Sequence, residues 1–310
     1  MQNGASVAAR FSGTPEKTAP VPPIPAAPLA DEIKAALPAL PTDVSVPDLG
    51  TSGKVIHSRR LAAIDAGFQA PTLSDAQTPT PFELACKPLL LASPAPGAMV
   101  DIELSAPCDS NARITVRHGA LSFTDVTDVS GNFAVSIPAL QEAAKVTVSF
   151  DYGRTIEASA HVSTLDGYSR SAIVWRGQTG LHIHALEFGA GYGDAGDVWA
   201  EAARTPDHGV RALGGFLTLL GNADVLNPEL AEVYSFPADR MARRGVVRMI
   251  VEADVAGTIC GQAIDGYTIE LGVDGAMRDV ALQLVMPDCD ATGGYLVLKN
   301  LLQDMKIAQN

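Results

Sequence analysis

Two histidines separated by a single residue are the side chains of this sequence best suited to binding a metal ion. His182 and His184 flank Ile183 in an apolar run that predicts a β-strand. Residues two apart on a strand project from the same face, so both imidazoles can reach one ion. The same pattern on the polar face of a half-exposed strand needs no metal, and both interpretations stay open. A third ligand would come from elsewhere in the chain. Sequence spacing does not choose among six candidates, namely Glu187, Asp194, Asp197, His118, His161 and His208.

A glycine-rich segment follows this strand and matches the pattern G-x-G-x-x-G. The segment runs from Gly191 to Gly196, but the helix that a dinucleotide site needs has room only from Val198 to Arg204. A calcium loop built on Asp194 and Asp197 lacks the spacing and the closing Glu of an EF-hand. A hairpin or bulge with glycines at positive φ explains the segment without a bound cofactor or ion. Apart from the possible metal ion, the sequence predicts no cofactor.

Signatures of other common catalytic sites are missing from the sequence. Neither a G-x-S-x-G elbow nor an H-E-x-x-H motif occurs. The segment from Gly50 to Val55 departs from a phosphate-binding loop at its first glycine and at its final Ser or Thr. Trp175 and Trp199 flank the histidine strand and its glycine loop, and we expect both in the core. No catalytic residue is predicted, and the sequence leans against an enzyme without excluding one.

The four cysteines predict disulfides. Cys86 and Cys108 form one local pair, and Cys260 and Cys289 form another. No C-x-x-C spacing occurs, so the usual zinc and thioredoxin patterns are absent. Two pairs, each inside its own β-rich region, indicate an oxidising compartment. Four reduced, buried cysteines in a cytosolic protein remain the alternative.

The start of the chain shows no secretory signal as written. The residues from Met1 to Gly4 carry no charged segment and lead into no apolar core. Either the protein stays in the cytoplasm, or an export signal or anchor lies upstream of Met1. Combined with the cysteines, this predicts a periplasmic or otherwise extracytoplasmic protein, anchored through such an upstream segment.

Net charge restricts the partners of the chain. Its 35 acidic and 22 basic residues give a formal charge of −13. A surface of this sign repels nucleic acid and anionic lipid. No apolar run reaches the roughly 18–20 residues that a membrane-spanning helix needs. We therefore expect a protein partner, no nucleic acid and no membrane-spanning segment in this chain.

Composition divides the chain into three parts, of which residues 1–85 form the first. Twelve of the 21 prolines fall there, and proline removes a backbone donor and interrupts both helices and sheets. The part is predicted to be a largely disordered, extended tether. Two short segments, Leu29–Leu37 and Ile56–Phe68, have enough apolar residues to dock. The alternative is an irregular strap that lies on the folded domains.

Residues 86–163 show the period-two alternation of β-strands. The alternating runs are Val100–Leu104, Ile114–His118, Phe133–Ile137 and Val146–Phe150. Gly, Pro and Asp separate them, which predicts an antiparallel sandwich.

One turn in this region carries a family resemblance. Thr127-Asp128, Gly131, Phe133 and the strand ending at Ile137-Pro138 resemble the carboxypeptidase-regulatory, transthyretin-like sandwich over residues 110–153. In such a turn the Asp caps the backbone, Gly takes positive φ and Phe is the first inward residue of the next strand. The resemblance implies an Ig-like structural module and no activity.

Residues 164–310 are predicted to form a second β-rich domain. Asp274-Gly275 joins two alternating runs, Tyr267–Val273 and Met277–Met286, as a hairpin. Tyr295–Ile307 fits a strand and a turn, or a short amphipathic helix. The stretches Gly180–Gly189 and Leu298–Asp304 resemble an uncharacterised group of alphaproteobacterial envelope proteins sometimes labelled "translocase", which implies an envelope location and no mechanism.

The sequence as a whole predicts a mainly β protein with two antiparallel β-sandwich-like (Ig/transthyretin-like) domains after a long disordered N-terminal segment. The function that it favours is a non-enzymatic, extracytoplasmic binding or scaffolding module tethered to the cell envelope. One alternative is a metal-binding protein or metalloenzyme centred on His182 and His184. Another is a self-assembling envelope or surface subunit, in which exposed edge strands pair between copies.

Overall fold

The computed structural model describes residues 6–8, 86–178, 180–255, 257, 259–291 and 293–307. Most of the predicted tether, with the segments Leu29–Leu37 and Ile56–Phe68, lies outside the described residues. The described chain is mainly β with antiparallel pairing, which confirms the predicted fold class.

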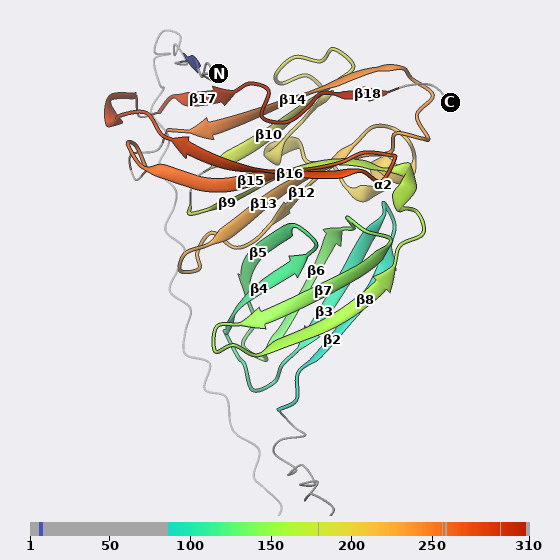
Figure 1. Ribbon diagram of the computed structural model, residues 1–310, viewed down its shortest axis with the longest axis vertical. Helices are drawn as coiled ribbons and strands as arrows, with labels where there is room; N and C mark the ends of the chain where they lie inside the picture. The colour runs from blue at the N-terminus through green and yellow to red at the C-terminus, as the bar shows by residue number, and fades with distance from the viewer. Residues whose placement is uncertain are drawn as a thin grey trace, which may run out of the picture. The chain divides into compact units, whose positions relative to one another are not determined.

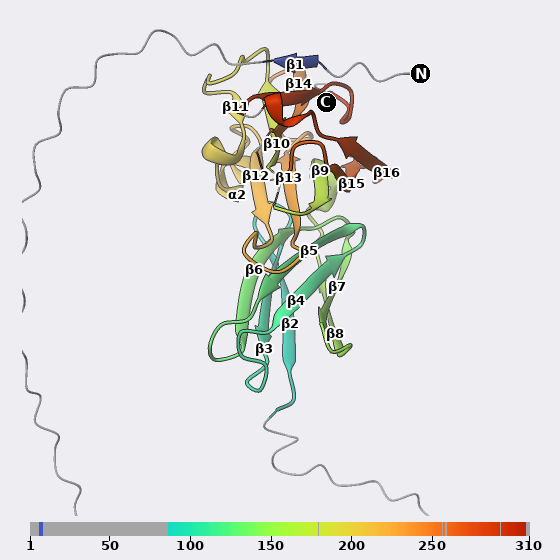
Figure 2. The ribbon, with the colours of Figure 1, turned by 90° about the vertical axis from the view of Figure 1, so that its left-hand side faces the viewer.

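Residues 86–163 form two sheets that enclose an apolar core (Figures 1 and 2). The first sheet has the order β2 (Leu89–Ala95), β3 (Met99–Ser105), β6 (Asn132–Pro138). The second has the order β5 (Leu121–Val126), β4 (Arg113–His118), β7 (Ala143–Phe150), β8 (Thr155–His161). The alternating runs of the sequence supply the inward rows, such as Val100, Ile102 and Leu104 on β3.

Two further sheets form the rest of the described chain. The five-stranded sheet has the order β12 (Phe216–Leu220), β13 (Glu229–Phe236), β9 (Ser169–Arg176), β15 (Ala263–Leu271), β16 (Met277–Val285). The six-stranded sheet has the order β1 (Ser6–Ala8), β17 (Tyr295–Leu298), β14 (Gly245–Asp254), β10 (Leu181–Glu187), β11 (Asp197–Val198), and β18 (Met305–Ile307) also pairs with β14. The C-terminal part is therefore a strand, a turn and a strand. The described helices are short, namely α2 (Pro206–Val210) and the 3-10 turns Leu165–Gly167, Ala200–Ala202 and Cys289–Ala291.

The five-stranded sheet contributes to two cores. On β9, Ala172 and Val174 pack with the apolar side chains of the first two sheets. Ile173 and Trp175, which alternate with them, pack with the six-stranded sheet. Because successive strand residues point to opposite faces, one strand joins both cores. The predicted burial of Trp175 is confirmed, with 4% of the residue exposed. Trp199 was also expected in the core but is only half-buried, because it follows the short strand β11 and stacks on His184.

Arg170 fixes the β2–β3 turn against the five-stranded sheet. Its guanidinium is fully buried and donates to the carbonyl oxygens of Gly97 and Ala98 and to Ser235 Oγ. Burial lowers the pKa of Arg170 to about 9. Gly97 has φ +83°, and a Cβ there would lie 2.9 Å from the Cβ of Pro206. The turn therefore fits this place only with glycine at position 97.

The turn that carries the family resemblance has the predicted local geometry. Asp128 Oδ1 accepts hydrogen bonds from the backbone N–H groups of Ser130 and Asn132, both at 2.8 Å. Gly131 has φ +79°, and a Cβ there would lie 1.9 Å from the carbonyl oxygen of Ala106. These contacts explain the residue types from their local chemistry.

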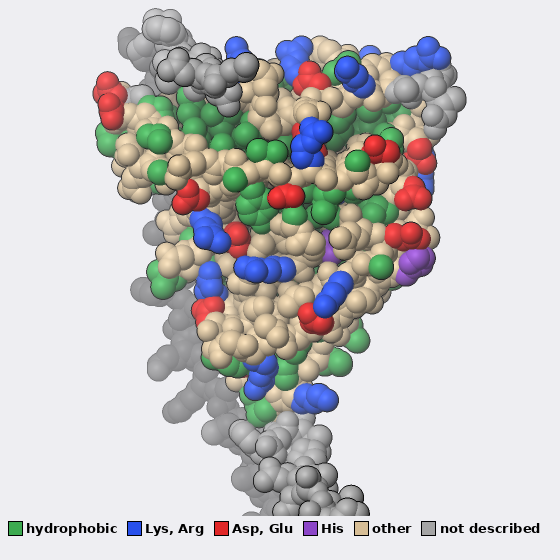
Figure 3. All heavy atoms as spheres, viewed as in Figure 1, with side chains coloured by type: hydrophobic (Ala, Val, Ile, Leu, Met, Phe, Trp, Pro, Cys, Tyr) green, Lys and Arg blue, Asp and Glu red, His purple; other side chains and the backbone are tan. Residues whose placement is uncertain are grey.

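Charged side chains of both signs are interspersed on the face seen in Figure 3. A mixed surface of this kind offers no continuous cationic track for a phosphate backbone on that face. Among the described residues, no helix combines the length and apolar character needed to cross a membrane.

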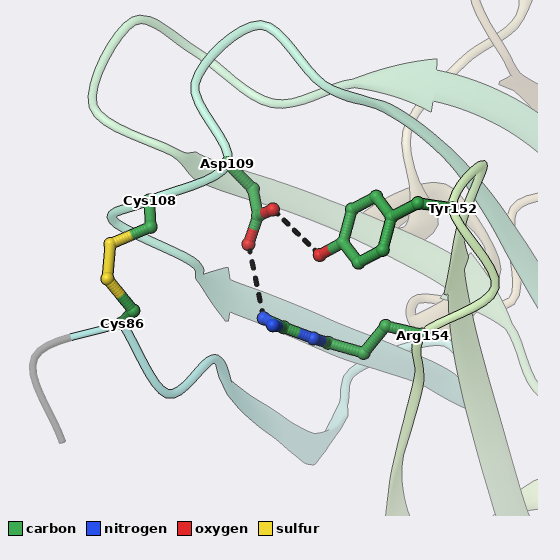
Figure 4. The surroundings of a disulfide bond; sticks show 5 residues. All are labelled: Cys86, Cys108, Asp109, Tyr152 and Arg154. Carbon is green, nitrogen blue, oxygen red and sulfur yellow. Dashed lines mark hydrogen bonds and ion pairs between the residues drawn. A yellow bond between two sulfur atoms is a disulfide. The ribbon is translucent and has the colours of Figure 1, made fainter. Parts of the chain in front are cut away.

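Both predicted disulfides are present. Cys86 bonds to Cys108 and Cys260 bonds to Cys289. Beside the first bond, Asp109 accepts a hydrogen bond from the Tyr152 hydroxyl at 2.7 Å and pairs with Arg154 at 3.5 Å (Figure 4). These contacts connect the disulfide loop to the β7–β8 turn. Two structural disulfides indicate a protein that resides outside the reducing cytoplasm.

Candidate functional site

Strand β10 places His182 and His184 on the outer face of the six-stranded sheet. Between and beside them, Leu181, Ile183 and Ala185 point inward and are fully buried. The antiparallel register with β14 sets Glu252 directly opposite His182. The predicted strand and the shared face of the two histidines are thus both observed.

His184 is enclosed rather than open. Its Nδ1 lies 2.9 Å from Asp197 Oδ1, so the ring N–H donates to this carboxylate. The imidazole stacks on Trp199 and meets Tyr192 edge-on, with ring centroids 4.9 Å apart in both cases. Only 5% of the residue is exposed. The second nitrogen, Nε2, is 3.8 Å from Glu252 Oε2. The residue is therefore held by side chains of the loop that follows β10.

His182 connects the two sheets of this part of the chain. Its Nδ1 donates to Glu232 Oε1 at 2.9 Å, and Glu232 lies on β13 of the facing sheet. The other oxygen of Glu232 accepts the backbone N–H of Ile183 at 2.7 Å. The hydrogen bond to Glu232 raises the pKa of His182, although burial opposes this, and Asp254 at 3.6 Å raises it further. A protonated imidazole is thus favoured in this position.

The glycine-rich segment is a turn that its own aspartates hold. Asp194 Oδ2 accepts the N–H of Gly191 at 2.8 Å, and Asp197 Oδ2 accepts the N–H of Gly193 at 2.9 Å. Gly193 has φ +77°, as expected for a tight turn. The segment from Val198 to Arg204 contains the last residue of β11 and one 3-10 turn, so it has no helix end for a pyrophosphate. These carboxylates bond the turn itself.

Tyr192, at the tip of this turn, reaches back to the sheet. Its hydroxyl donates to Glu252 Oε1 at 2.6 Å. Burial raises the pKa of Tyr192, and the Glu252 carboxylate raises it further. The ring thereby covers His184, and the predicted strand and turn form one unit.

Glu187 faces the interior, on the opposite side of β10 from the histidines. Its Oε1 accepts the Tyr234 hydroxyl at 2.7 Å and the N–H of Gly215 at 2.6 Å. Its Oε2 accepts from Arg204 at 2.9 Å. The carboxylate is 4% exposed and joins three segments, so it serves as an internal support.

The remaining candidate ligands lie elsewhere. His118 is buried in the first sandwich, where its Nε2 accepts the N–H of Leu140 at 2.8 Å and burial lowers its pKa. His161 is exposed and lies 3.3 Å from Glu142. His208 belongs to α2. Of the six predicted third ligands, Asp197 alone contacts one of the two histidines through a described hydrogen bond or ion pair.

Over the described ranges, no group of three or more His, Cys, Asp or Glu side chains has an arrangement that would hold a metal ion. Sequence reasoning missed Glu232 and Glu252, which the fold brings to the histidines from β13 and β14. No local sequence pattern predicts these two contacts, because each glutamate lies about fifty residues or more from the histidine it contacts. In this arrangement each imidazole can share a proton with the carboxylate that it contacts.

A separate apolar groove lies on the outer face of the sheet β2–β3–β6. Leu89 and Leu91 are 57% and 52% exposed there. Ala134 lies opposite Glu103 and continues this face across β6, Phe133 borders the groove from the inward row, and the volume of the groove is about 470 Å³. Glu103 lies opposite Leu91 in the strand register and is exposed. The groove thus combines apolar side chains with two acidic residues, Glu103 and Asp128. The sequence pattern did not predict it, because β2 was not recognised as a strand.

No protein-family model matches this chain, and no curated protein matches it.

Proposed function

We propose that this protein is a non-enzymatic binding or scaffolding module of the cell envelope, with residues 1–85 as its tether. Its compartment is the periplasm or another extracytoplasmic space. The transthyretin-like resemblance of residues 110–153 supports a structural module. The two disulfides support the compartment, because they persist where the environment is oxidising.

The engagement of the buried polar groups favours binding over catalysis. His184 is packed beneath Tyr192 and Trp199 and bonds Asp197. Glu187 accepts three hydrogen bonds from the protein itself. Side chains held in this way stabilise the fold and present no nucleophile to a substrate.

The observation that carries the binding proposal is the groove on β2–β3–β6. Two leucines more than half exposed, side by side on one strand face, leave apolar area that a partner can cover. Glu103 beside them favours a partner segment that adds a Lys or Arg to its apolar side chains. A protein partner of this composition fits the groove.

Site-specific photo-cross-linking in living cells tests this proposal. A photoreactive phenylalanine analogue replaces Leu91 in the groove, and a matched variant carries it at Leu226, which is 80% exposed on another part of the chain. We expect a discrete protein adduct from position 91 that position 226 does not give. Adding Glu103→Lys should weaken that adduct. Identical adduct patterns at both positions, or none at position 91, would contradict a partner in the groove.

A further inference from the structure

Strand β16 forms an edge of the five-stranded sheet. It pairs with β15 along its whole length, from Met277 opposite Leu271 to Val285 opposite Ala263. Figure 2 shows β16 at the right-hand margin of its sheet, beyond β15. Its nine residues make it the longest strand at a sheet edge among the described strands. Its outer backbone groups form a template for another strand.

The composition of β16 does little to block such pairing. From Val280 to Val285 the strand has no charge and no proline. Met277, Val280 and Val285 are 40%, 50% and 69% exposed. Edge strands that stay unpaired usually carry charges or proline, as β8 does with Glu157 and His161. The two charges of β16, Arg278 and Asp279, lie within its first three residues. Figure 3 shows apolar side chains gathered on the face on which β15 and β16 lie in Figure 1.

The inward side of β16 is also incompletely covered. Val280 and Leu282 line a hollow of about 520 Å³ between β16 and the segment that follows β17. Leu298 and Leu301 form part of its other wall. Apolar side chains on this side therefore remain available to a neighbouring strand.

We propose that β16 pairs antiparallel with β16 of a second copy of this chain, with Ala281 on the two-fold axis. Ala281 is the middle residue, so this register alone pairs all nine residues of the strand. It sets Met277 opposite Val285 and Val280 opposite Leu282, which matches apolar with apolar side chains. The two five-stranded sheets then form one continuous sheet. Both β16 edges are paired, so neither is left for a third copy.

Charge supports the same register. Asp279 faces Gln283 of the second copy, whose amide donates one N–H to Asp265 of its own chain and has a second N–H for this carboxylate. Arg278 faces Leu284 in this register. A shift of the axis to Asp279 would place two aspartates directly opposite, which is unfavourable. A shift to Val280 would set Met277 opposite Gln283 and lose both apolar matches. This pairing goes beyond the proposed function, because it depends neither on the compartment nor on the groove of β2–β3–β6.

Sedimentation equilibrium of the oxidised full chain over a concentration series tests the pairing. We expect the mass to rise from one copy to two and to stop there. Ala281→Lys places two lysines opposite each other at the axis and should weaken the dimer about fivefold. Ala276→Lys makes the same change at an exposed alanine outside the paired strand and should leave association unchanged. Circular dichroism confirms that both variants fold.

The residue at position 283 gives a second test that depends on the sign of its charge. Gln283→Lys faces Asp279 of the second copy and should tighten the dimer, whereas Gln283→Glu should weaken it. A monomer at all concentrations would overturn the proposal. Growth beyond two copies, equal effects of the two lysine variants at positions 281 and 276, or equal effects of the two changes at position 283 would each overturn it as well.

Discussion

Replacing Glu187 by alanine should destabilise the protein by about 3–5 kcal/mol. The carboxylate is buried and accepts from Tyr234, Gly215 and Arg204 at 2.6–2.9 Å. Hydrogen bonds to a charged group contribute about 1.5–3 kcal/mol each, but their effects do not add. Removing one partner of a buried ion pair costs about 3–5 kcal/mol, because the other charge is left without compensation. This is the range that we expect.

Urea denaturation followed by circular dichroism measures the effect. With a slope of about 3 kcal/mol/M, the midpoint should fall by about 1–2 M. Glu157→Ala is the control, since Glu157 pairs with Lys145 at 2.9 Å but is 51% exposed. Exposed pairs contribute about 0–1 kcal/mol. Tyr234→Phe removes one donor and should cost about 1.5–3 kcal/mol.

The comparison refutes the reasoning if Glu187→Ala and Glu157→Ala shift the midpoint equally. Such a result would mean that Glu187 is not an internal support. Glu187 would then be a candidate metal ligand again, because a carboxylate that does not stabilise the fold is available to bind an ion.

Three further outcomes follow from the same contacts. Glu232 raises the pKa of His182 above 6.5. The contact between the two side chains therefore stabilises the folded state fully below about pH 6.5, and this stabilisation is lost as the pH rises through the folded-state pKa of His182. The difference in unfolding free energy between wild type and Glu232→Gln should shrink over that rise, and a pH-independent difference would contradict it. Replacing Cys86 and Cys108 by serine should cost about 3–4 kcal/mol for a loop of 22 residues, measured by urea denaturation; an unchanged midpoint would count against it. Zinc should leave the melting temperature unchanged, since His184 is enclosed; a rise that His184→Ala abolishes would favour the metal-binding alternative.

Local patterns predicted those parts of the fold whose causes are local. The alternation in Val100–Leu104 gave β3, and Asp274-Gly275 gave the β15–β16 hairpin, with Gly275 at φ +73°. Asp128 and Gly131 formed the expected turn. Each of these features depends on residues within a few positions of one another, so the sequence contains the full signal.

Features that depend on distant segments were not predicted. Strand β13 was missed because Glu229 and Glu232 look like surface residues, yet both are buried. Glu232 is buried because it bonds His182 across the sheets. Strand β2 contains Pro94, which discourages a strand assignment, but Pro94 lies at an edge strand where its missing donor is tolerated.

The state of the four cysteines in cells tests the central claim most directly. Cells are treated with an alkylating reagent before lysis, and the isolated protein is digested without reduction by a protease that cleaves after glutamate. Cleavage after Glu103 and Glu270 leaves the cysteines of each pair on different peptides. We predict linked peptides that join Cys86 to Cys108 and Cys260 to Cys289, with no alkylated cysteine. Four alkylated cysteines would contradict the extracytoplasmic module proposed for this chain.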